Sequence, residues 1–403
     1  MPNTGALTGF VHRRRGLAEL ILLVLALAVP LSGAGLALLV GERKAVNRWI
    51  TLTCSLAMLG VAAWRALAAG EPTTLVQSRW TDFIADLPVR GGDYLSLALV
   101  TFILFAENPA DAAVIEVGLG GMYDATNVLQ RPAASLIMPI AMDHQQWLGQ
   151  TIEEIALAKA GIVKRGVPAV FGRQDEEAAL GVLIDRAERL GAPYFVYGQD
   201  YLAHEENGRL LYQDDGGLMD LPLPALPGRH QYSNAGAAIR TVKAAGFAVN
   251  EEIASRAMKG VTWPARLQRL KTGSLVALAP EGSEIWLDGG HNPHGGRAVA
   301  EAMAAFEERD PRPLYMITGM INTKDPKGNF EAFVGLARQA FTVGIHNSDA
   351  TIDPVALAHD AAEAGLSAAP ASSAVEALAR IAQLAGGDER PPRARTVPIR
   401  HAP

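Results

Sequence analysis

Three side chains with charged or ligating groups lie in one stretch of the chain, residues 112–161: Glu116, His144 and Lys159. A carboxylate, an imidazole and an ammonium group that meet at one place can together bind a charged ligand. The sequence around them predicts that they meet. Glu116 lies near the end of one apolar run typical of a buried strand, and His144 follows a second such run. Open α/β sheets bind their ligands at the carboxyl ends of the strands.

The elements that must position these side chains are two strands and one helix. We expect a buried strand at Ala112–Val117, which contains Glu116, and a second at Ala134–Ala141, which stops before His144. A short helix follows, because Thr151 and Glu154 have the spacing of a capping box. Gly161 is a natural C-terminal stop for that helix.

Composition limits what else the chain can be. At 403 residues it is too long for one ordinary core, so two or three units are expected. A net charge of −6 gives no general attraction to nucleic acid, and none is predicted as a partner. The one cysteine, Cys54, excludes an internal disulfide framework and a multi-cysteine metal site, which favours a reducing, cytoplasmic location for the catalytic part.

Residues 1–75 differ from the rest of the chain. The run Leu20–Gly41 has no charged residue and is long enough to span a bilayer, and Trp49–Trp64 is a second uncharged run. These apolar helical segments predict membrane contact through residues 17–69, as a hairpin or as a spanning helix with a shorter one. A signal peptide and a buried helical pair in a soluble domain are the alternatives.

The middle of the chain alternates predicted strands and helices, which indicates a largely parallel sheet covered by helices on both faces. A polar segment, Gln199–Leu221, is rich in turn residues and predicts a surface hairpin. The predicted helices are Leu95–Ala106, Glu176–Leu190 and His230–Ala245, and the further strands are Gly166–Gly172 and Tyr194–Tyr197.

A second α/β unit starts near Trp263-Pro264. We expect Ser274–Ala279 and Glu284–Leu287 to be paired strands, a helix at Gly295–Phe306 and a strand at Leu314–Thr318. The proline- and arginine-rich tail, residues 391–403, is typical of an unstructured segment. The expected domains are therefore 1–75, 76–262, 263–390 and this tail.

Five motifs occur in an order that resembles the folylpolyglutamate synthases, including the bacterial enzymes that are also dihydrofolate synthases. The motifs are EVGLGGMYDATNV, DHQQWLG with TIEEIALAKAGI, HQYSNAGAAI, PARLQ and LDGGHNPHGG. The resemblance covers about residues 96–390. It implies the α/β fold of the Mur ligase superfamily, with an incomplete central parallel-sheet domain and a C-terminal α/β domain.

The resemblance also implies roles for the three side chains of the first stretch. Glu116 and His144 match the magnesium ligands, and one or two protein ligands suffice for Mg²⁺ at ATP phosphates. Lys159 matches a lysine that the family carries as a carbamate, and with His144 it is the expected catalytic residue. Without the resemblance, these would be a strand-end carboxylate, a core histidine and a solvated helix lysine.

Other positions match ligand contacts of the family. Asn234, Arg266 and Asp288 match nucleotide contacts, and His291 lies in the same loop as Asp288. Arginine suits phosphate because its planar fork can bind two oxygens, although a surface ion pair is the plainer interpretation. Tyr123, Asp124 and Ala125 match pterin contacts, or else form a simple polar loop. His294 and Lys324 also belong to the pattern.

The reaction implied is ATP-dependent ligation through an acyl phosphate. Magnesium and ATP are the cofactors, L-glutamate is the amine, and dihydropteroate or a folate is the acid. Catalysis of phosphoryl transfer is mainly positioning and charge neutralisation. The protein is expected to be a monomer.

One expected part is missing from these residues. No G-x-x-x-x-G-K-[ST] sequence, the phosphate-binding P-loop, occurs in them. Its absence predicts weak or no activity, by the loss of charge-positioning groups. Two alternatives to the folate ligase follow: a membrane-tethered remnant that folds without catalysing the reaction, and another Mur-type amino-acid ligase.

Overall fold

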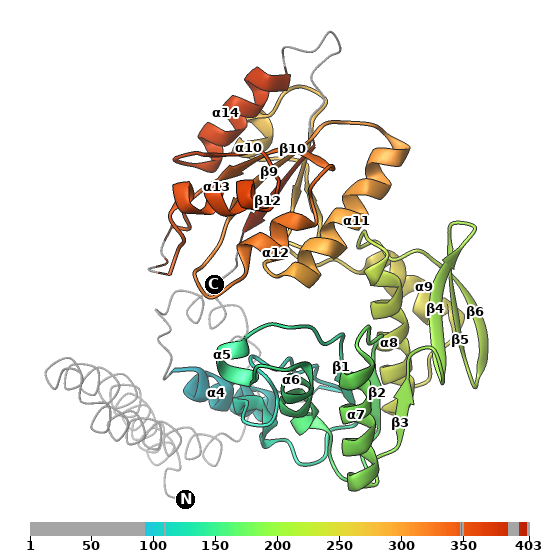
Figure 1. The fold of residues 1–403 in the computed structure, drawn as a ribbon. Helices are drawn as coiled ribbons and strands as arrows, with labels where there is room; N and C mark the ends of the chain where they lie inside the picture. Colours follow the sequence, from blue (N-terminus) through green and yellow to red (C-terminus); the bar gives the residue numbers. More distant parts are fainter. Residues whose placement is uncertain (1–92, 109, 347, 349, 386–394, 401–403) are drawn as a thin grey trace, which may run out of the picture. The chain divides into compact units, whose positions relative to one another are not determined.

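The computed structural model describes residues 93–108, 110–346, 348, 350–385 and 395–400 (Figure 1). The chain divides into two compact units, residues 1–118 and 119–403. The membrane and signal-peptide predictions concern residues 1–75, which lie outside the described residues. Among the helices that the structure does describe, none combines the length and the hydrophobicity needed to cross a membrane.

The described part of the first unit has one helix, α4 (Asp93–Glu107), which confirms the helix predicted at 95–106. The strand predicted at Ala112–Val117 is wrong: these residues form no helix or strand, and Val114 is 97% exposed. A strand needs a neighbour for its backbone groups. No described strand pairs with this segment, so the apolar run alone does not make it one.

The first sheet of the second unit is parallel, in the order β1-β2-β3. Its strands are β1 (Ser135–Ile137), β2 (Ala169–Phe171) and β3 (Tyr194–Val196). They confirm the three strands expected there after residue 130, each shorter than predicted.

Helices cover both faces of this sheet, as predicted. Ala169 and Phe171 of β2 pack into one core with α6 (Ile152–Lys159) and α7 (Glu177–Leu190). Val170, which points to the opposite face, packs into another core with α8 (His230–Ala244). Figure 1 shows α6 and α7 beside the sheet and α8 between it and the next sheet.

The predicted surface hairpin is present and carries one more strand. It is an antiparallel sheet in the order β4-β5-β6, whose buried side chains include Leu210 and Tyr212. Asn207 and Gly208 join the first two strands with φ of 52° and 76°, the conformation that a two-residue hairpin turn requires. The strands are β4 (Tyr201–Glu206), β5 (Arg209–Asp214) and β6 (Gly217–Pro222), and α9 (Glu251–Gly260) follows α8.

A six-stranded sheet forms the remainder of the second unit, in the order β11-β10-β9-β12-β8-β7. Its strands are β7 (Gln268–Leu270), β8 (Glu284–Leu287), β9 (Leu314–Gly319), β10 (Ala337–Thr342), β11 (Ala368–Pro370) and β12 (Arg395–Arg400). Its helices are α10 (Ser274–Leu278), α11 (Pro293–Arg309), α12 (Pro326–Glu331), α13 (Pro354–Glu363) and α14 (Ala374–Ala385). The α/β class with parallel sheets is thus confirmed.

Two sequence predictions in this part are wrong. The strand expected at Ser274–Ala279 is the helix α10, and β8 pairs instead with β7, antiparallel. The tail expected to be unstructured provides β12 at Arg395–Arg400, which lies between β8 and β9 and is parallel to both. β12 pairs with β9 along its whole length and with β8 at Arg395 and Thr396. Such pairing depends on distant strands, so a proline-rich composition does not reveal it. The domain boundaries stay a prediction.

Gly161 has a different role from the one predicted. Helix α6 ends at Lys159, and Gly161 lies in a following 3₁₀ turn, η2 (Ala160–Ile162), without a positive φ. A Cβ on Gly161 would come within 2.3 Å of the Met122 Cα. The glycine is therefore required by the close approach of the loop 119–124.

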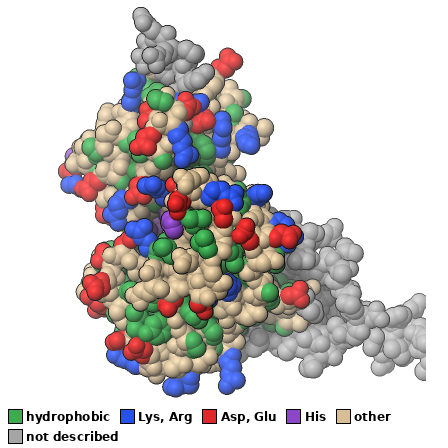
Figure 2. Space-filling model, turned by 90° about the vertical axis from the view of Figure 1, so that its right-hand side faces the viewer, with side chains coloured by type: hydrophobic (Ala, Val, Ile, Leu, Met, Phe, Trp, Pro, Cys, Tyr) green, Lys and Arg blue, Asp and Glu red, His purple; other side chains and the backbone are tan. Residues whose placement is uncertain are grey.

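Charges of both signs are mixed on the face that Figure 2 shows, with Lys and Arg side chains beside Asp and Glu side chains. No single-sign patch dominates that face.

Candidate functional site

The four residues predicted to bind nucleotide line one cavity of about 540 Å³ in the second unit. Asn234 is on α8, Arg266 precedes β7, and Asp288 and His291 follow β8. The further lining residues used below are Met138, Pro139, Arg173, Asp175, Arg229, His230, His294 and Arg297. Residues far apart in the chain are thus brought together around one space.

Asp288 fixes the loop that follows β8. One of its carboxylate oxygens accepts the Leu267 N–H at 2.8 Å and the other accepts the Gly290 N–H at 2.6 Å. Burial raises the pKa of this carboxyl, and the two backbone bonds and the nearby Arg266 lower it. The Asp288 carboxylate therefore fixes the segments of Leu267 and Gly290, which lie at the cavity, relative to each other.

Arg266 is presented by a strained segment. Ala265 and Leu267 on either side of it have positive φ, 54° and 43°, which residues other than glycine rarely adopt. Such backbone strain is found mainly where a surrounding structure holds it for function. The Arg266 side chain is exposed, and no ion pair with it is found within the described residues, so its fork is available to a ligand.

Asp143 is the centre of a polar cluster close to this cavity. Its two carboxylate oxygens accept hydrogen bonds from Lys324 Nζ and Asn292 Nδ2, each at 2.8 Å. The Lys324 side chain is only 3% exposed. Burial raises the pKa of Asp143, but the bonds from Lys324 and Asn292 and the charge of Lys324 outweigh it and hold the pKa at about 2. His291 Nε2 lies 3.8 Å from the same carboxylate.

His144 is next to this cluster and also has strained backbone. It is the residue before α5 (Gln145–Leu148), with φ 54° and ψ 32°. Its Nε2 lies 3.5 Å from Lys324 Nζ and 3.8 Å from an Asp143 oxygen. Burial lowers the pKa of the imidazole, Asp143 raises it, and the ammonium groups of Lys324 and Lys159 lower it further. The net shift favours the neutral form of the ring, and its Nε2 faces the ammonium of Lys324.

Lys159 is half-buried at the last position of α6. Burial lowers the pKa of its amine and the charge of Asp143 opposes that shift. The capping box predicted for α6 is present: the Glu154 N–H donates to Thr151 Oγ1 at 3.3 Å, and the Thr151 N–H donates to the Glu154 carboxylate at 3.4 Å.

Glu116 belongs to the first unit, where it is exposed and outside any helix or strand. Its predicted role as a magnesium ligand beside His144 stays a prediction. Within the described residues, no group of three or more His, Cys, Asp and Glu side chains has the arrangement of a metal site.

The three residues predicted to contact the pterin do not line the cavity. Tyr123 is 95% exposed. Asp124 caps the 3₁₀ helix η1 (Ala125–Val128), where its carboxylate accepts the N–H groups of Thr126 and Leu119, each at 2.9 Å. These bonds agree with the plain loop interpretation of Asp124 and Ala125, and substrate contact stays a prediction.

Sequence reasoning did not single out Asp143, Arg173 or His230 as site residues. Asp143 had a usable signal, since it follows a strand and immediately precedes His144. Arg173 and His230 had none, because their place in the cavity depends on how β2 and α8 pack.

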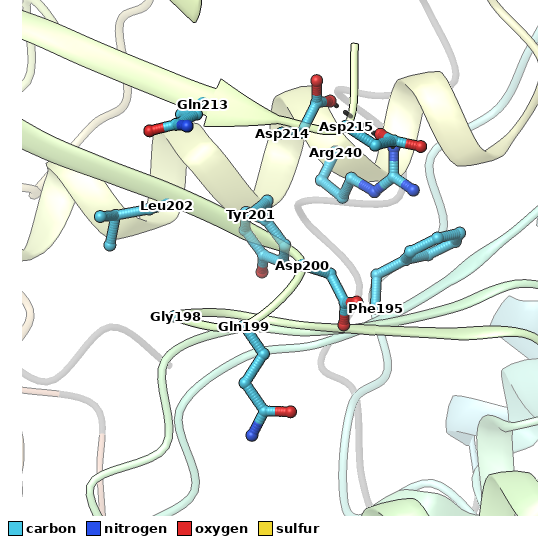
Figure 3. Close-up of a pocket in the computed structure, with 10 residues that line it drawn as sticks. All are labelled: Phe195, Gly198, Gln199, Asp200, Tyr201, Leu202, Gln213, Asp214, Asp215 and Arg240. Carbon is cyan, nitrogen blue, oxygen red and sulfur yellow. Dashed lines mark hydrogen bonds and ion pairs between the residues drawn. The ribbon is translucent and has the colours of Figure 1, made fainter. Parts of the chain in front are cut away.

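A second cavity, of about 510 Å³, lies between the β3–β4 loop and α8 (Figure 3). Its arginine, Arg240, pairs with Asp214 and Asp215 at 3.6 and 3.3 Å and lies over the Phe195 ring at 3.6 Å. None of the predicted site residues lines it. The arrangement is that of an ion-pair network joining α8 to the end of β5, in which Arg240 and Asp214 are buried and Asp215 is exposed.

No model of a known protein family matches this chain. Individual proteins do match. The chain is 33% identical over 231 residues to the folylpolyglutamate synthase of Lacticaseibacillus casei, covering 55% of this chain and 50% of that protein. It is 35% identical over 260 residues to the dihydrofolate synthase/folylpolyglutamate synthase of Mycobacterium tuberculosis, covering 59% and 50%.

The solved structures agree with the sequences. The crystal structure of Mycobacterium tuberculosis folylpolyglutamate synthase complexed with ADP and AMPPCP matches with a TM-score of 0.66 and 26% identity, over 86% of this chain and 77% of that one. This chain is a relative of the folylpolyglutamate and dihydrofolate synthases. The resemblance to that Mur ligase family is thus confirmed, and the chain spans about half the length of the curated relatives it matches.

Proposed function

We propose that this protein is an ATP-dependent ligase that joins L-glutamate to dihydropteroate or to a folate through an acyl phosphate. The observation that carries the proposal is the cavity in which Asn234, Arg266, Asp288 and His291 come together. Its support from relatives is that their names state this activity and that one solved relative holds ADP and AMPPCP.

The nucleotide would bind in this cavity, with Arg266 directed to its phosphates. An exposed guanidinium held by a rigid loop can donate two parallel hydrogen bonds to phosphate oxygens. Arg229 and Arg297 also line the cavity and add positive charge, whereas Arg173 is paired with Asp175 at 3.0 Å. Phosphoryl transfer needs mainly such positioning and charge neutralisation.

Magnesium would be held by His144, with Glu116 as the second predicted ligand. The ring of His144 offers a nitrogen ligand, and the Asp143 carboxylate 3.8 Å from its Nε2 favours a cation there. The ammonium of Lys324, 3.5 Å from the same nitrogen, opposes it and would have to move away. A bound magnesium ion would supply charge neutralisation for the phosphates. Lys159 and Asp143 would orient the charged groups around it.

The carbamate on Lys159 is part of the proposal. Carbon dioxide adds to a neutral amine, and the burial that lowers the pKa of Lys159 increases the neutral fraction. Mass spectrometry of the intact protein at alkaline pH in bicarbonate is the direct measurement. The same mass increase in Lys159→Gln would contradict the assignment.

The decisive experiment measures magnesium-dependent ADP release from ATP with L-glutamate and either dihydropteroate or folate. We expect ADP release above background, weak because the sequence has no P-loop motif. Arg266→Gln should reduce it about tenfold or more. Arg269→Gln is the matched control: Arg269 is three residues away, pairs with Glu284 at 3.0 Å and does not line the cavity.

The same assay separates the two alternatives. Release that depends on a peptidoglycan precursor rather than on a pterin acid would favour another Mur-type ligase. No ADP release and no ADP binding would favour the remnant. Monomeric state, a cytoplasmic location and membrane contact through residues 17–69 are further parts of the proposal, which light scattering and detergent-free solubility would test.

A further inference from the structure

The first turn of α8 contains a buried amide between two residues of the cavity. The Gln231 residue is 8% exposed. Its Nε2 lies 3.0 Å from His230 Nε2, and its Oε1 accepts a hydrogen bond from Asn234 Nδ2 at 3.1 Å. His230 and Asn234 both line the cavity, but Gln231 does not.

The direction of these bonds is fixed by chemistry once one of them is known. An amide nitrogen only donates and an amide oxygen only accepts. If Asn234 donates to the Gln231 oxygen, the Gln231 nitrogen faces His230, and His230 Nε2 must then accept. The neutral imidazole in this arrangement carries its proton on Nδ1.

A reversed arrangement is the one alternative that satisfies the same contacts. His230 would donate from Nε2, Gln231 would turn its amide over, and Asn234 would show its nitrogen rather than its oxygen to the cavity. Burial and the charges of His294 and Arg266 lower the pKa of His230, while Asp288 and Glu301 raise it. A protonated His230 would force this reversed arrangement.

We propose that Gln231 is a positioning residue for the nucleotide site. Its amide nitrogen donates to the unprotonated Nε2 of His230, which turns its oxygen toward Asn234. Asn234 is thereby held with its carbonyl oxygen toward the cavity. This inference rests on the proposed function, since it assumes that a nucleotide binds there. The Asn234 oxygen has no partner within the described residues, so it is available as an acceptor for a ligand N–H.

A packing role alone would not need an amide. A buried amide without hydrogen bonds costs free energy relative to an apolar side chain of the same shape. Gln231→Met keeps the length and removes both bonds, and Gln231→Glu keeps the acceptor for Asn234 but requires a proton on His230 Nε2. The control is Thr241→Val on the same helix, since the Thr241 hydroxyl bonds to the Ala237 carbonyl and Thr241 does not line the cavity.

The experiment combines titration calorimetry of Mg²⁺–ADP with nitrogen NMR of the imidazole of His230, whose signal is assigned by its loss in His230→Gln. In the unmodified protein at pH 8 we expect the proton on Nδ1. Gln231→Met should weaken ADP binding about tenfold, the effect of losing one well-placed hydrogen bond. Gln231→Glu should bind ADP within about threefold of the unmodified protein and move the proton to Nε2. Thr241→Val should change neither quantity.

Two results would overturn the inference: a proton on Nε2 of His230 in the unmodified protein, or full ADP affinity in a folded Gln231→Met. Failure of the proposed function has a different signature, because no variant would then bind ADP. The NMR result would still decide whether the hydrogen bonds run from Asn234 to Gln231 and from Gln231 to His230. A Gln231→Met chain that does not fold is replaced by Gln231→Leu, judged by the same two measurements.

Discussion

The Asp143 carboxylate joins parts of the second unit that are far apart in sequence. It follows β1, yet its hydrogen bonds come from the residues before α11 and α12. Lys324, with a 3% exposed side chain, has this carboxylate as its ion-pair partner among the described residues. A buried ammonium without a partner is costly, so Asp143 matters more to stability than a surface carboxylate does.

We therefore expect Asp143→Asn to lower the free energy of unfolding by roughly 1–3 kcal/mol, because the amide has no charge to offset Lys324. Urea unfolding followed by circular dichroism measures this. Lys327→Gln is the control, since its pair with Glu363 is more than half exposed on both sides, and its effect should stay within about 0.5 kcal/mol. Equal effects from the two variants would show that the Asp143 cluster adds no stability.

The same carboxylate predicts an acid limit. The pKa of Asp143 is lowered to about 2 in the folded chain from a usual 3.8. The stabilisation is complete above pH 4 and is lost as the pH falls toward 2, since only the unfolded chain binds the proton in that window. Its size is on the order of 2 kcal/mol. Unfolding free energies measured from pH 5 to 2 should show this drop, and Asp143→Asn should flatten that part of the profile.

At the scale of elements, the start of α6 is fixed by a capping box, a local pattern that is visible in the sequence. Thr151 accepts the Glu154 N–H and Glu154 returns a bond to the Thr151 N–H. Thr151→Ala should lower the free energy of unfolding by about 1 kcal/mol, as for other N-cap threonines. Thr241→Ala, which removes a hydroxyl from the last turn of α8, should not destabilise the protein. Melting temperatures of the two variants show whether the loss of stability comes from the helix cap or from the loss of any threonine hydroxyl.

Two glycines should respond in opposite directions to the same substitution. A Cβ at Gly161 would lie 2.3 Å from the Met122 Cα, whereas a Cβ at Gly181 in α7 would meet nothing within 4 Å. Gly161→Ala should destabilise the protein by about 1–3 kcal/mol through overpacking. Gly181→Ala should stabilise it by about 0.5–1 kcal/mol, because alanine loses less entropy in a helix. Denaturant midpoints with unchanged slopes would report both effects, and the same sign for both would contradict the packing argument.

At the scale of the whole molecule, β12 determines whether the six-stranded sheet is continuous. Removing residues 395–403 would leave β8 and β9 without the strand that pairs with both. We expect this deletion to abolish cooperative unfolding of the C-terminal sheet, because two central edges would lose their hydrogen-bond partners. Deletion of residues 401–403 alone is the control and should leave the melting curve unchanged. Calorimetry of the two truncated chains decides, and identical curves would mean that β12 contributes nothing.

Patterns with a local cause could be predicted from the sequence by itself: the capping box of α6, the amphipathic α7, a hairpin within Gln199–Leu221 and the strands β1, β2 and β9. The motifs also indicated the family, and they contain Asn234, Arg266, Asp288 and His291, which line one cavity and whose nucleotide contact stays a prediction. Local signals succeed there because caps, turns and periodic apolar faces depend on neighbours within a few residues.

Only the tertiary structure decided the features that depend on distant partners. Residues 112–117 are apolar enough for a strand but have no described neighbour to pair with, whereas residues 395–400, in the proline- and arginine-rich tail, have a neighbour on each edge. Likewise, Asp143 gains its low pKa from Lys324 and Asn292, which no spacing along the chain connects to it. Strand pairing and charge pairing are non-local interactions. The sequence by itself therefore determined which polar and charged groups are present, and the tertiary structure determined which of them are in contact.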